Sequence, residues 1–139
     1  MCCRKNTIQD KREKSRGFIA ENAMVVSARE EASKIGLDIM KLGGNAFDAM
    51  VATDLALLVS YPVAGNIGGG GFMVFRMADG TTGALDYREM APISATKNMY
   101  LDQEGKVVSD KSKTGALAIG VPGTIAGLFE IHNKFGTIS

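Results

Sequence analysis

The layering of this fold is decided by residues 45–62, NAFDAMVATDLALLVSYP. Asn45 is a residue type that caps helices, and Asp48 places an acid in the first turn, so a helix is predicted to begin here and to run toward Pro62. Its valines, leucines and alanines cover most of the helix surface instead of one stripe. A helix of this kind is expected to lie between two layers of structure, and its small residues permit close packing.

Before this segment, a second helix is predicted by apolar residues that share one helical face, namely Ala32, Ile35, Ile39 and Leu42. Glu30 and Glu31 occupy its first turn, where the helix dipole favours acids, and Gly43 is a typical C-terminal stop. Residues 17–26 precede this helix and contain a short apolar run, which predicts a strand.

The helix at residues 45–62 is followed by a glycine-rich loop at residues 65–72, GNIGGGGF. A phosphate-binding loop follows a strand and opens a helix, whereas this loop leaves a helix and enters a strand, so nucleotide binding is not predicted. Four successive glycines instead indicate backbone that passes close to other backbone or to a ligand. The next residues predict a hairpin, with strands at 72–77 and 82–87 and a turn at Asp79-Gly80.

Residues 91–114 are polar and rich in turn formers, which predicts a surface segment with one short helix near Met99. A short strand is predicted over residues 117–121. The sequence Pro122-Gly123-Thr124 then opens a last helix, which ends at Gly136. The residues expected to share one face of this helix are Ile125, Leu128, Phe129 and His132.

Charge is divided unevenly along the chain, because residues 1–16 have a formal charge of +4 and the remainder −3. Residues 1–20 are predicted to be a basic, disordered segment, and residues 21–139 to form the folded part. The acidic balance of the folded part argues against nucleic-acid binding. The longest apolar stretch, residues 49–61, is too short to span a membrane. The basic start lacks the apolar run of a secretory signal, which predicts either a cytoplasmic protein or a true start further upstream.

The polar residues do not assemble a cofactor, metal or triad motif. Cys2 and Cys3 are adjacent, so a disulfide between them would enclose no loop, and one histidine leaves no spacing that suits a metal. A serine nucleophile elbow is absent, and His132 lacks identifiable triad partners. No cofactor and no metal are predicted, and His132 is interpreted as a partly buried helix residue.

Arg88 is the side chain that best suits a binding role. It follows a predicted strand and precedes Ala91-Pro92, so it lies where the chain turns. A guanidinium in such a place binds a carboxylate through two parallel hydrogen bonds. A salt bridge to Asp86 or Glu89 is the competing interpretation, and the spacing alone favours the salt bridge.

Five strings occur in an order and spacing that resemble one family. They are MVVSAR (residues 24–29), GGNAFDA (43–49), GNIGGGGFM (65–73), DYREMAP (86–92) and GVPGT (120–124). Together they resemble the N-terminal part of γ-glutamyltranspeptidases, over roughly residues 24–137. Each string alone is weakly specific, whereas all five in sequence are strongly specific.

The resemblance implies a partial α+β fold of the N-terminal nucleophile hydrolases, in which antiparallel sheets lie between helical layers (αββα). It also implies an enzyme made as one precursor, which cuts itself and exposes a threonine at the start of its small subunit. That threonine attacks the γ-glutamyl carbonyl of glutathione and related compounds, and the acyl group passes to water or to an amino acid. The free α-amine of the threonine serves as its base, so the chemistry needs no histidine.

Within this chain the resemblance assigns one binding residue, because Arg88 corresponds to the arginine that binds the glutamyl α-carboxylate. Asp86 and Glu89 are expected to orient its guanidinium. The chain stops before the family's processing site, so no catalytic residue is expected in it. Thr137 follows the last helix, where the family has large-subunit sequence, and it is not the nucleophile.

The chain alone is therefore expected to be inactive and to need the C-terminal part, or small subunit, as its partner. Family members are often periplasmic or secreted. Two alternatives remain. One is an acylase of the same superfamily that acts on a glutaryl amide, and the other is a non-catalytic remnant or interaction module.

Overall fold

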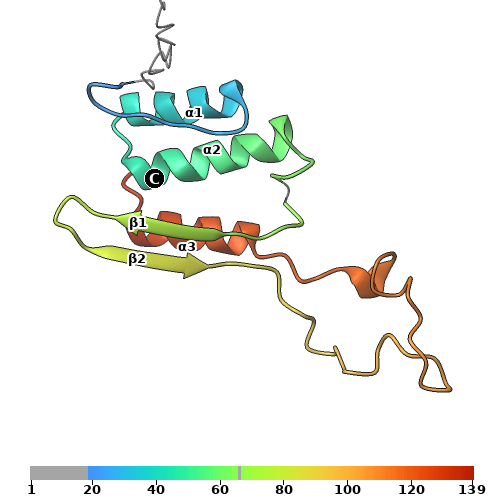
Figure 1. Cartoon of the computed structure of the whole chain (residues 1–139). Coiled ribbons are helices and arrows are strands. Elements are labelled where there is room, and N and C mark those ends of the chain that lie inside the picture. Colours follow the sequence, from blue (N-terminus) through green and yellow to red (C-terminus); the bar gives the residue numbers. More distant parts are fainter. Residues whose placement is uncertain (1–18, 66) are drawn as a thin grey trace, which may run out of the picture.

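The computed structural model describes residues 19–65 and 67–139 (Figure 1). The elements in chain order are α1 (Glu30–Lys41), α2 (Ala46–Ser60), β1 (Phe72–Arg76), β2 (Thr82–Asp86), the short 3-10 helix η1 (Ala116–Ala118) and α3 (Thr124–Phe135). Most of the basic segment predicted at residues 1–20, including Cys2 and Cys3, lies outside the described residues.

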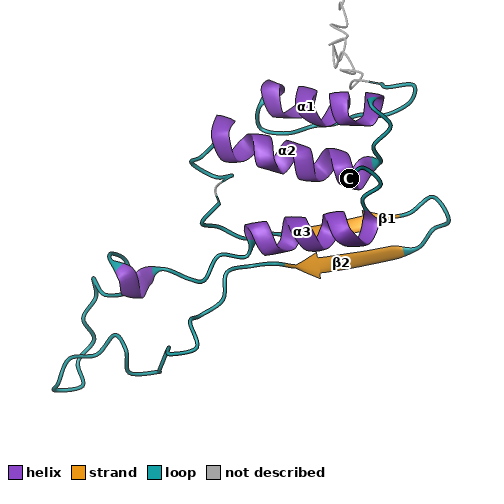
Figure 2. Cartoon of the chain, turned by 180° about the vertical axis from the view of Figure 1, so that it is seen from behind, coloured by secondary structure: helices purple, strands orange, loops and turns teal. Residues whose placement is uncertain are grey.

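The helices and the hairpin are arranged in layers. Figure 1 shows α1 stacked on α2, with the hairpin and α3 on the opposite side of α2. In Figure 2, which shows the chain from behind, α3 lies in front of β1 and covers one face of the hairpin. Helix α2 thus lies between α1 and α3, as its apolar composition predicts. The mixture of helices and an antiparallel sheet confirms the α+β class.

The N-terminus of α2 is built by the predicted capping residues. The Asn45 side chain accepts hydrogen bonds from the backbone N–H groups of Phe47 and Asp48, at 2.8 and 3.0 Å. The Asp48 carboxylate in turn accepts one from the N–H of Asn45 at 2.9 Å. This reciprocal pair satisfies donors that otherwise lack partners at the start of a helix.

Helix α1 packs on α2 through small residues. Gly36 is buried against Thr53 of α2, where a larger side chain would not fit. Gly43, with φ of +99°, ends the helix region as predicted. The apolar residues of the predicted face are covered unequally, since Ala32 is fully buried while Ile35 and Leu42 remain 45% and 78% exposed. The close approach at Gly36 turns a face of small residues toward α2, and this leaves the larger ones at its edge.

Strands β1 and β2 form the predicted antiparallel hairpin, with Val74 opposite Ala84. Gly80 in the connecting turn has φ of +91°, a conformation that glycine adopts without steric cost. The two faces of β1 differ in exposure, because Met73 is 5% exposed and Val74 is 82% exposed. Only the Met73 face is covered within the part of the chain that the structure describes.

Three phenylalanine rings join α2, β1 and α3. The rings of Phe47 and Phe135 stack with their centroids 4.6 Å apart, and Phe75 approaches them at 5.5 and 5.0 Å. Contacts of this kind contribute beyond simple burial of area. The buried apolar side chains around the three helices are Ala32, Ala49, Met73, Leu128 and Ile131.

Two predicted strands are wrong. Residues 19–26 are extended but form no strand, because the hairpin lies on the other side of α2 and offers them no partner backbone. Val25 instead packs beside Gly36 of α1. Residues 117–121 contain part of η1, and only Val121 pairs in strand fashion, with Met90.

Two details of the helices also differ from the prediction. The segment near Met99 forms hydrogen-bonded turns, not a helix. On α3, Phe129 is 64% exposed, whereas Ile131, outside the predicted face, is fully buried. Helix α3 touches both α2 and the hairpin, so its buried surface is wider than one stripe and is displaced toward the hairpin. Within residues 19–65 and 67–139, no helix has the length and apolar character needed to cross a membrane.

Candidate functional site

Arg88 lies two residues after β2, in a segment that continues the strand and is held by backbone on both sides. On one side, Tyr87 exchanges hydrogen bonds with Gly71, at 3.0 and 3.4 Å. On the other side, Met90 exchanges hydrogen bonds with Val121, at 3.1 and 2.8 Å. The backbone position of Arg88 is therefore fixed by chain segments that precede and follow it by many residues.

The Arg88 side chain is exposed and lines an open concavity together with Asp86, Glu89, Met90 and Gly120. Its guanidinium carbon lies 5.9 Å from the centroid of the Phe72 ring. Among the described residues, no ion pair includes Arg88. The salt bridge that the spacing favoured is not formed there, and Arg88 lines the concavity without an acid partner.

The two acids beside Arg88 have different relations to it. Asp86 accepts a hydrogen bond from the backbone N–H of Arg88 at 3.0 Å, and so it acts on the backbone of that residue. Glu89 makes no ion pair with Arg88 and lines the concavity beside it. The structure thus brings the three sequence-predicted residues to one surface.

The glycine-rich loop supports this surface through its backbone. A Cβ atom at Gly70 would lie 2.7 Å from both the Tyr87 oxygen and the Glu89 nitrogen, so only glycine fits. The Gly69 carbonyl accepts hydrogen bonds from the N–H groups of Gly123 and Thr124, at 2.9 and 3.1 Å. The close passage of backbone beside backbone, predicted from four successive glycines, is confirmed. This carbonyl thus occupies the N–H groups of the N-cap residue and of the first residue of α3.

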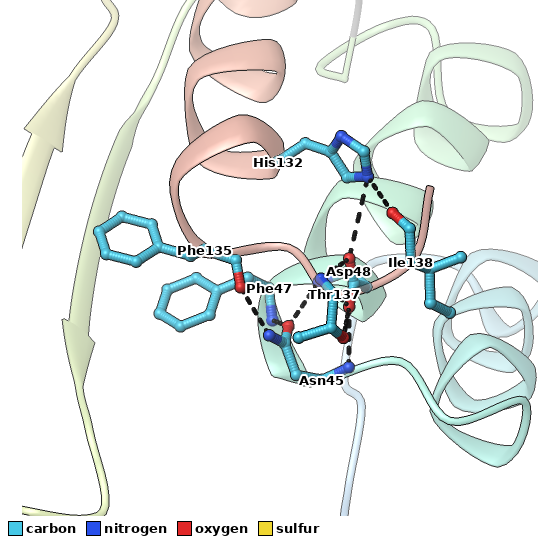
Figure 3. Close-up of polar contacts among 7 residues, drawn as sticks. All are labelled: Asn45, Phe47, Asp48, His132, Phe135, Thr137 and Ile138. Carbon is cyan, nitrogen blue, oxygen red and sulfur yellow. Dashed lines mark hydrogen bonds and ion pairs between the residues drawn. The ribbon is translucent and has the colours of Figure 1, made fainter.

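A second polar cluster lies at the start of α2 and joins it to the segment after α3 (Figure 3). Asp48 is 5% exposed, and its carboxylate accepts a hydrogen bond from the Thr137 hydroxyl at 2.7 Å. The Thr137 N–H lies 3.1 Å from each carboxylate oxygen. The Asn45 amide donates to the Phe135 carbonyl at 2.6 Å. We call these four residues the Asp48 cluster.

His132 borders the Asp48 cluster without forming a catalytic triad. Its Nε2 lies 2.8 Å from the Ile138 carbonyl oxygen and 3.9 Å from the nearer Asp48 oxygen (Figure 3). The Thr137 hydroxyl donates directly to Asp48, so no imidazole stands between hydroxyl and carboxylate as a triad requires. The interpretation of His132 as a partly buried helix residue fits this geometry, and the cluster has a structural role.

In the sequence, Asp48 is recognisable only as an acid in the first turn of a helix. Asp48 and Thr137 are 89 positions apart in the sequence, and no local pattern predicts their contact. The local signal that was available is Gly136, which ends α3 and after which the chain is extended.

The ionisation of Asp48 makes the cluster sensitive to acid. Burial raises the pKa of this carboxyl, but hydrogen bonds from Thr137, Asn45 and Ile138 lower it more, so the pKa lies below its usual value. A carboxylate whose pKa is lower in the folded than in the unfolded chain contributes stability in full above the unfolded pKa. That contribution is lost as the pH falls toward the folded pKa.

We therefore expect the difference in unfolding free energy between the wild type and Asp48→Asn to be largest near neutral pH. It should shrink as the pH falls through the ordinary carboxyl range, about pH 4, because the wild type then loses its charged acceptor. Urea unfolding followed by circular dichroism at a series of pH values measures this difference. A gap that stays constant down to about pH 3 would show that ionised Asp48 is not the source.

A third group of polar residues lies on the other side of the glycine-rich loop. Asp54 of α2 is half-buried in a pocket that Tyr87 and the glycines also line. Burial raises the pKa of the Asp54 carboxyl. Burial also raises the pKa of Tyr87, and the negative charge of Asp54 adds to this effect. No group of three or more potential metal-ligating side chains occurs among the residues whose placement is described.

Comparison with known proteins identifies the family. A family model described as gamma-glutamyltranspeptidase matches residues 32–139. A glutathione hydrolase proenzyme of Pseudomonas sp. (strain A14) is 57% identical over 118 residues, which are 85% of this chain and 20% of that protein. The chain thus spans about a fifth of the length of the curated relatives that it matches first.

Solved structures agree with the family match. The gamma-glutamyltranspeptidase of Helicobacter pylori superimposes with a TM-score of 0.82 at 49% identity, covering 88% of this chain and 35% of that one. A cephalosporin acylase from Bacillus halodurans superimposes with a TM-score of 0.67 at 28% identity, covering 90% of this chain and 24% of that one. The fold is accordingly part of the N-terminal nucleophile hydrolase sandwich. On the family model and these relatives together, the chain belongs to the gamma-glutamyltranspeptidase family.

Proposed function

We propose that this chain is the N-terminal part of a γ-glutamyltransferase or glutathione hydrolase, in which Arg88 binds the α-carboxylate of a γ-glutamyl compound such as glutathione. The observation that carries the proposal is that Arg88 lines an open concavity and has no acid partner among the described residues. A planar, permanently charged guanidinium without an acid partner can bind a carboxylate ligand through two parallel hydrogen bonds.

The acids around Arg88 favour a ligand that also carries a positive charge. Asp86 and Glu89 line the same concavity, and their carboxylates would attract the α-ammonium of a glutamyl group. Asp86 also orients Arg88 through its backbone N–H. A glutaryl group has the corresponding carboxylate but lacks the ammonium, so the local charge supports a glutamyl substrate over a glutaryl one.

The nucleophile belongs to sequence other than this chain in the proposed enzyme. Thr137 is engaged by Asp48 through both its hydroxyl and its N–H, and it is not free to attack a carbonyl. We propose that residues 21–139 form the Arg88 side of the site and that a C-terminal part or small subunit supplies the threonine. The expected reaction is acyl transfer through a threonine ester, with water or an amino acid as acceptor.

Two measurements on the purified chain test the proposal. The chain alone should not hydrolyse a γ-glutamyl anilide, and turnover by it would overturn the division of the site. Glutathione binding, followed by the backbone amide NMR signals of Glu89, Met90 and Gly120 beside Arg88, should be weakened about 10- to 150-fold by Arg88→Lys. This corresponds to the loss of about 1.5–3 kcal/mol for a charge-assisted hydrogen bond.

The matched control is Arg76→Lys, since Arg76 is also exposed but lies at the far end of β1, outside the concavity. This variant should bind glutathione as the wild type does. Equal binding by the wild type and Arg88→Lys would contradict the proposed role of Arg88.

The similarity to a cephalosporin acylase supports a second candidate, an acylase that acts on a glutaryl-type amide. Competition between glutathione and a glutaryl amide, followed by the same amide signals, separates the two. Preference for the compound with the α-ammonium supports the γ-glutamyl reading, and preference for the glutaryl compound supports the acylase.

A further inference from the structure

We infer that Tyr87 is a positioning residue for Arg88, and that glycines 70, 71, 123 and 127 form the socket that holds it. The inference rests on the proposed function, because it concerns how the guanidinium of Arg88 is kept in place for a ligand. No feature of the sequence pointed to Tyr87, which is the residue before Arg88 in the DYREMAP string.

The Tyr87 ring is packed between the end of the glycine-rich loop and helix α3. A Cβ atom at Gly71 would lie 2.8 Å from the ring carbon Cε2. On the other side, a Cβ atom at Gly127 would lie 2.5 Å from Tyr87 Cβ and 2.6 Å from ring carbon Cδ2. Both distances are too short for a real side chain, so the ring fills the space that these two glycines leave.

The Tyr87 backbone is enclosed as tightly as its ring. Its carbonyl oxygen is 2.7 Å from the position of a Cβ at Gly70, and it would overlap a Cβ at Gly123. Its N–H and carbonyl also bond to Gly71. Four glycines therefore surround one residue, and any shift of Tyr87 must move the backbone of Arg88, which follows it directly.

The Arg88 side chain has little else to hold it. In the described part of the chain it takes part in no ion pair, and its guanidinium carbon lies 5.9 Å from the centroid of the Phe72 ring. Phe72 is itself the residue that follows Gly71, so both partners in this contact are anchored by the Tyr87 socket. Small errors in the placement of a binding group cost large factors in function.

The test uses NMR on the whole chain, with and without glutathione. In the wild type, a through-space contact between the Arg88 side chain and the Phe72 ring reports the position of the guanidinium without any ligand. In Tyr87→Leu this contact should be lost and glutathione binding should weaken about tenfold or more. Tyr87→Phe, which keeps the ring, should retain both, because no hydrogen bond of the Tyr87 hydroxyl supports the arrangement within the described residues.

Tyr100→Leu is the matched control, because Tyr100 lies in the surface segment and donates its hydroxyl to the Leu117 carbonyl. It should leave the Arg88 contact and glutathione binding unchanged. Gly71→Ala serves if Tyr87→Leu does not fold, since the new methyl would lie 2.8 Å from ring carbon Cε2 and 3.0 Å from the hydroxyl oxygen, so the ring must shift to admit it. It should weaken the Arg88 contact and glutathione binding, as Tyr87→Leu does.

The outcomes separate this inference from the proposed function. If Tyr87→Leu or Gly71→Ala folds with the Arg88 contact intact, Tyr87 does not position Arg88. If the wild type shows the contact but does not bind glutathione, the proposed function is wrong. The positioning role of Tyr87 can then still be tested by the NMR contact between Arg88 and Phe72 in the variants.

Discussion

Replacing Asp48 by alanine is expected to lower the free energy of unfolding by about 3–5 kcal/mol, because several buried hydrogen-bond donors then lose their acceptor, each at a cost of about 1–3 kcal/mol. The carboxylate is 5% exposed and accepts hydrogen bonds from Asn45, from the Thr137 N–H and from the Thr137 hydroxyl. Its removal leaves these donors without an acceptor in a place that water reaches poorly. The loss would consume much of the stability of a chain of this size.

The matched control for this variant is Asp38→Ala, which makes the same substitution in α1. Asp38 is exposed and pairs with Lys41 at 3.1 Å on the helix surface. Exposed pairs contribute little, so this variant should lose less than about 1 kcal/mol. Urea unfolding of the two variants provides the comparison. Similar losses in both would mean that the Asp48 cluster does not join α2 to the segment after α3.

Gly123→Ala is expected to be the most damaging glycine substitution near Arg88, with a loss of at least about 3 kcal/mol. Gly123 has φ of −109°, so any residue could adopt its backbone conformation. The cost arises from space, because the new methyl would overlap the Tyr87 carbonyl oxygen and lie 2.9 Å from that of Arg88. Both oxygens belong to backbone that is held on two sides and cannot move aside cheaply.

Gly80→Ala is the matched comparison for Gly123→Ala, because at Gly80 the backbone conformation disfavours alanine while the surrounding space is open. Gly80 has φ of +91°, which disfavours alanine, but no atom lies within 4 Å of a Cβ placed there. This variant should lose about 1–2 kcal/mol, the cost of a left-handed conformation for a residue with a side chain. Thermal or urea unfolding ranks the two variants. If Gly80→Ala proves the more harmful, the space around Gly123 is less filled than the contacts indicate.

The elements that could be predicted from the sequence are those whose signals are local. The capping box of Asn45 and Asp48, the stop at Gly43 and the turn at Gly80 all depend on residues within four positions of one another. Their geometry is set by backbone conformation and short-range hydrogen bonds, which residue type largely determines.

The elements that could not be predicted depend on distant partners. Residues 19–26 have the composition of a strand, but no strand lies beside them to pair with. Ile35 shares a helix face with the buried Ala32, but α2 packs against Gly36 and leaves Ile35 45% exposed. Periodicity tells which residues share a helix face, but not which part of that face a neighbouring helix will cover.

The candidate site divides in the same way. Arg88 and its neighbouring acids could be predicted from a family resemblance and a short motif. The role of Tyr87 instead depends on glycines that pack against it and lie up to 40 positions away in the sequence. The glycine-rich loop indicated a close backbone approach, but nothing in it named the residue that would be approached. The Asp48 cluster joins residues up to 90 positions apart in the sequence, and no local sequence pattern predicts it.

The distance along the chain between Asp48 and Thr137 also sets an order of events during synthesis. When α2 leaves the ribosome, its first-turn carboxylate has its Asn45 partner but must wait for Thr137, which is translated much later. Until then Asp48 in the nascent chain is hydrogen-bonded to Asn45 but not to Thr137. This part of the fold is therefore completed only after the segment that follows α3 has been synthesised and has returned to α2.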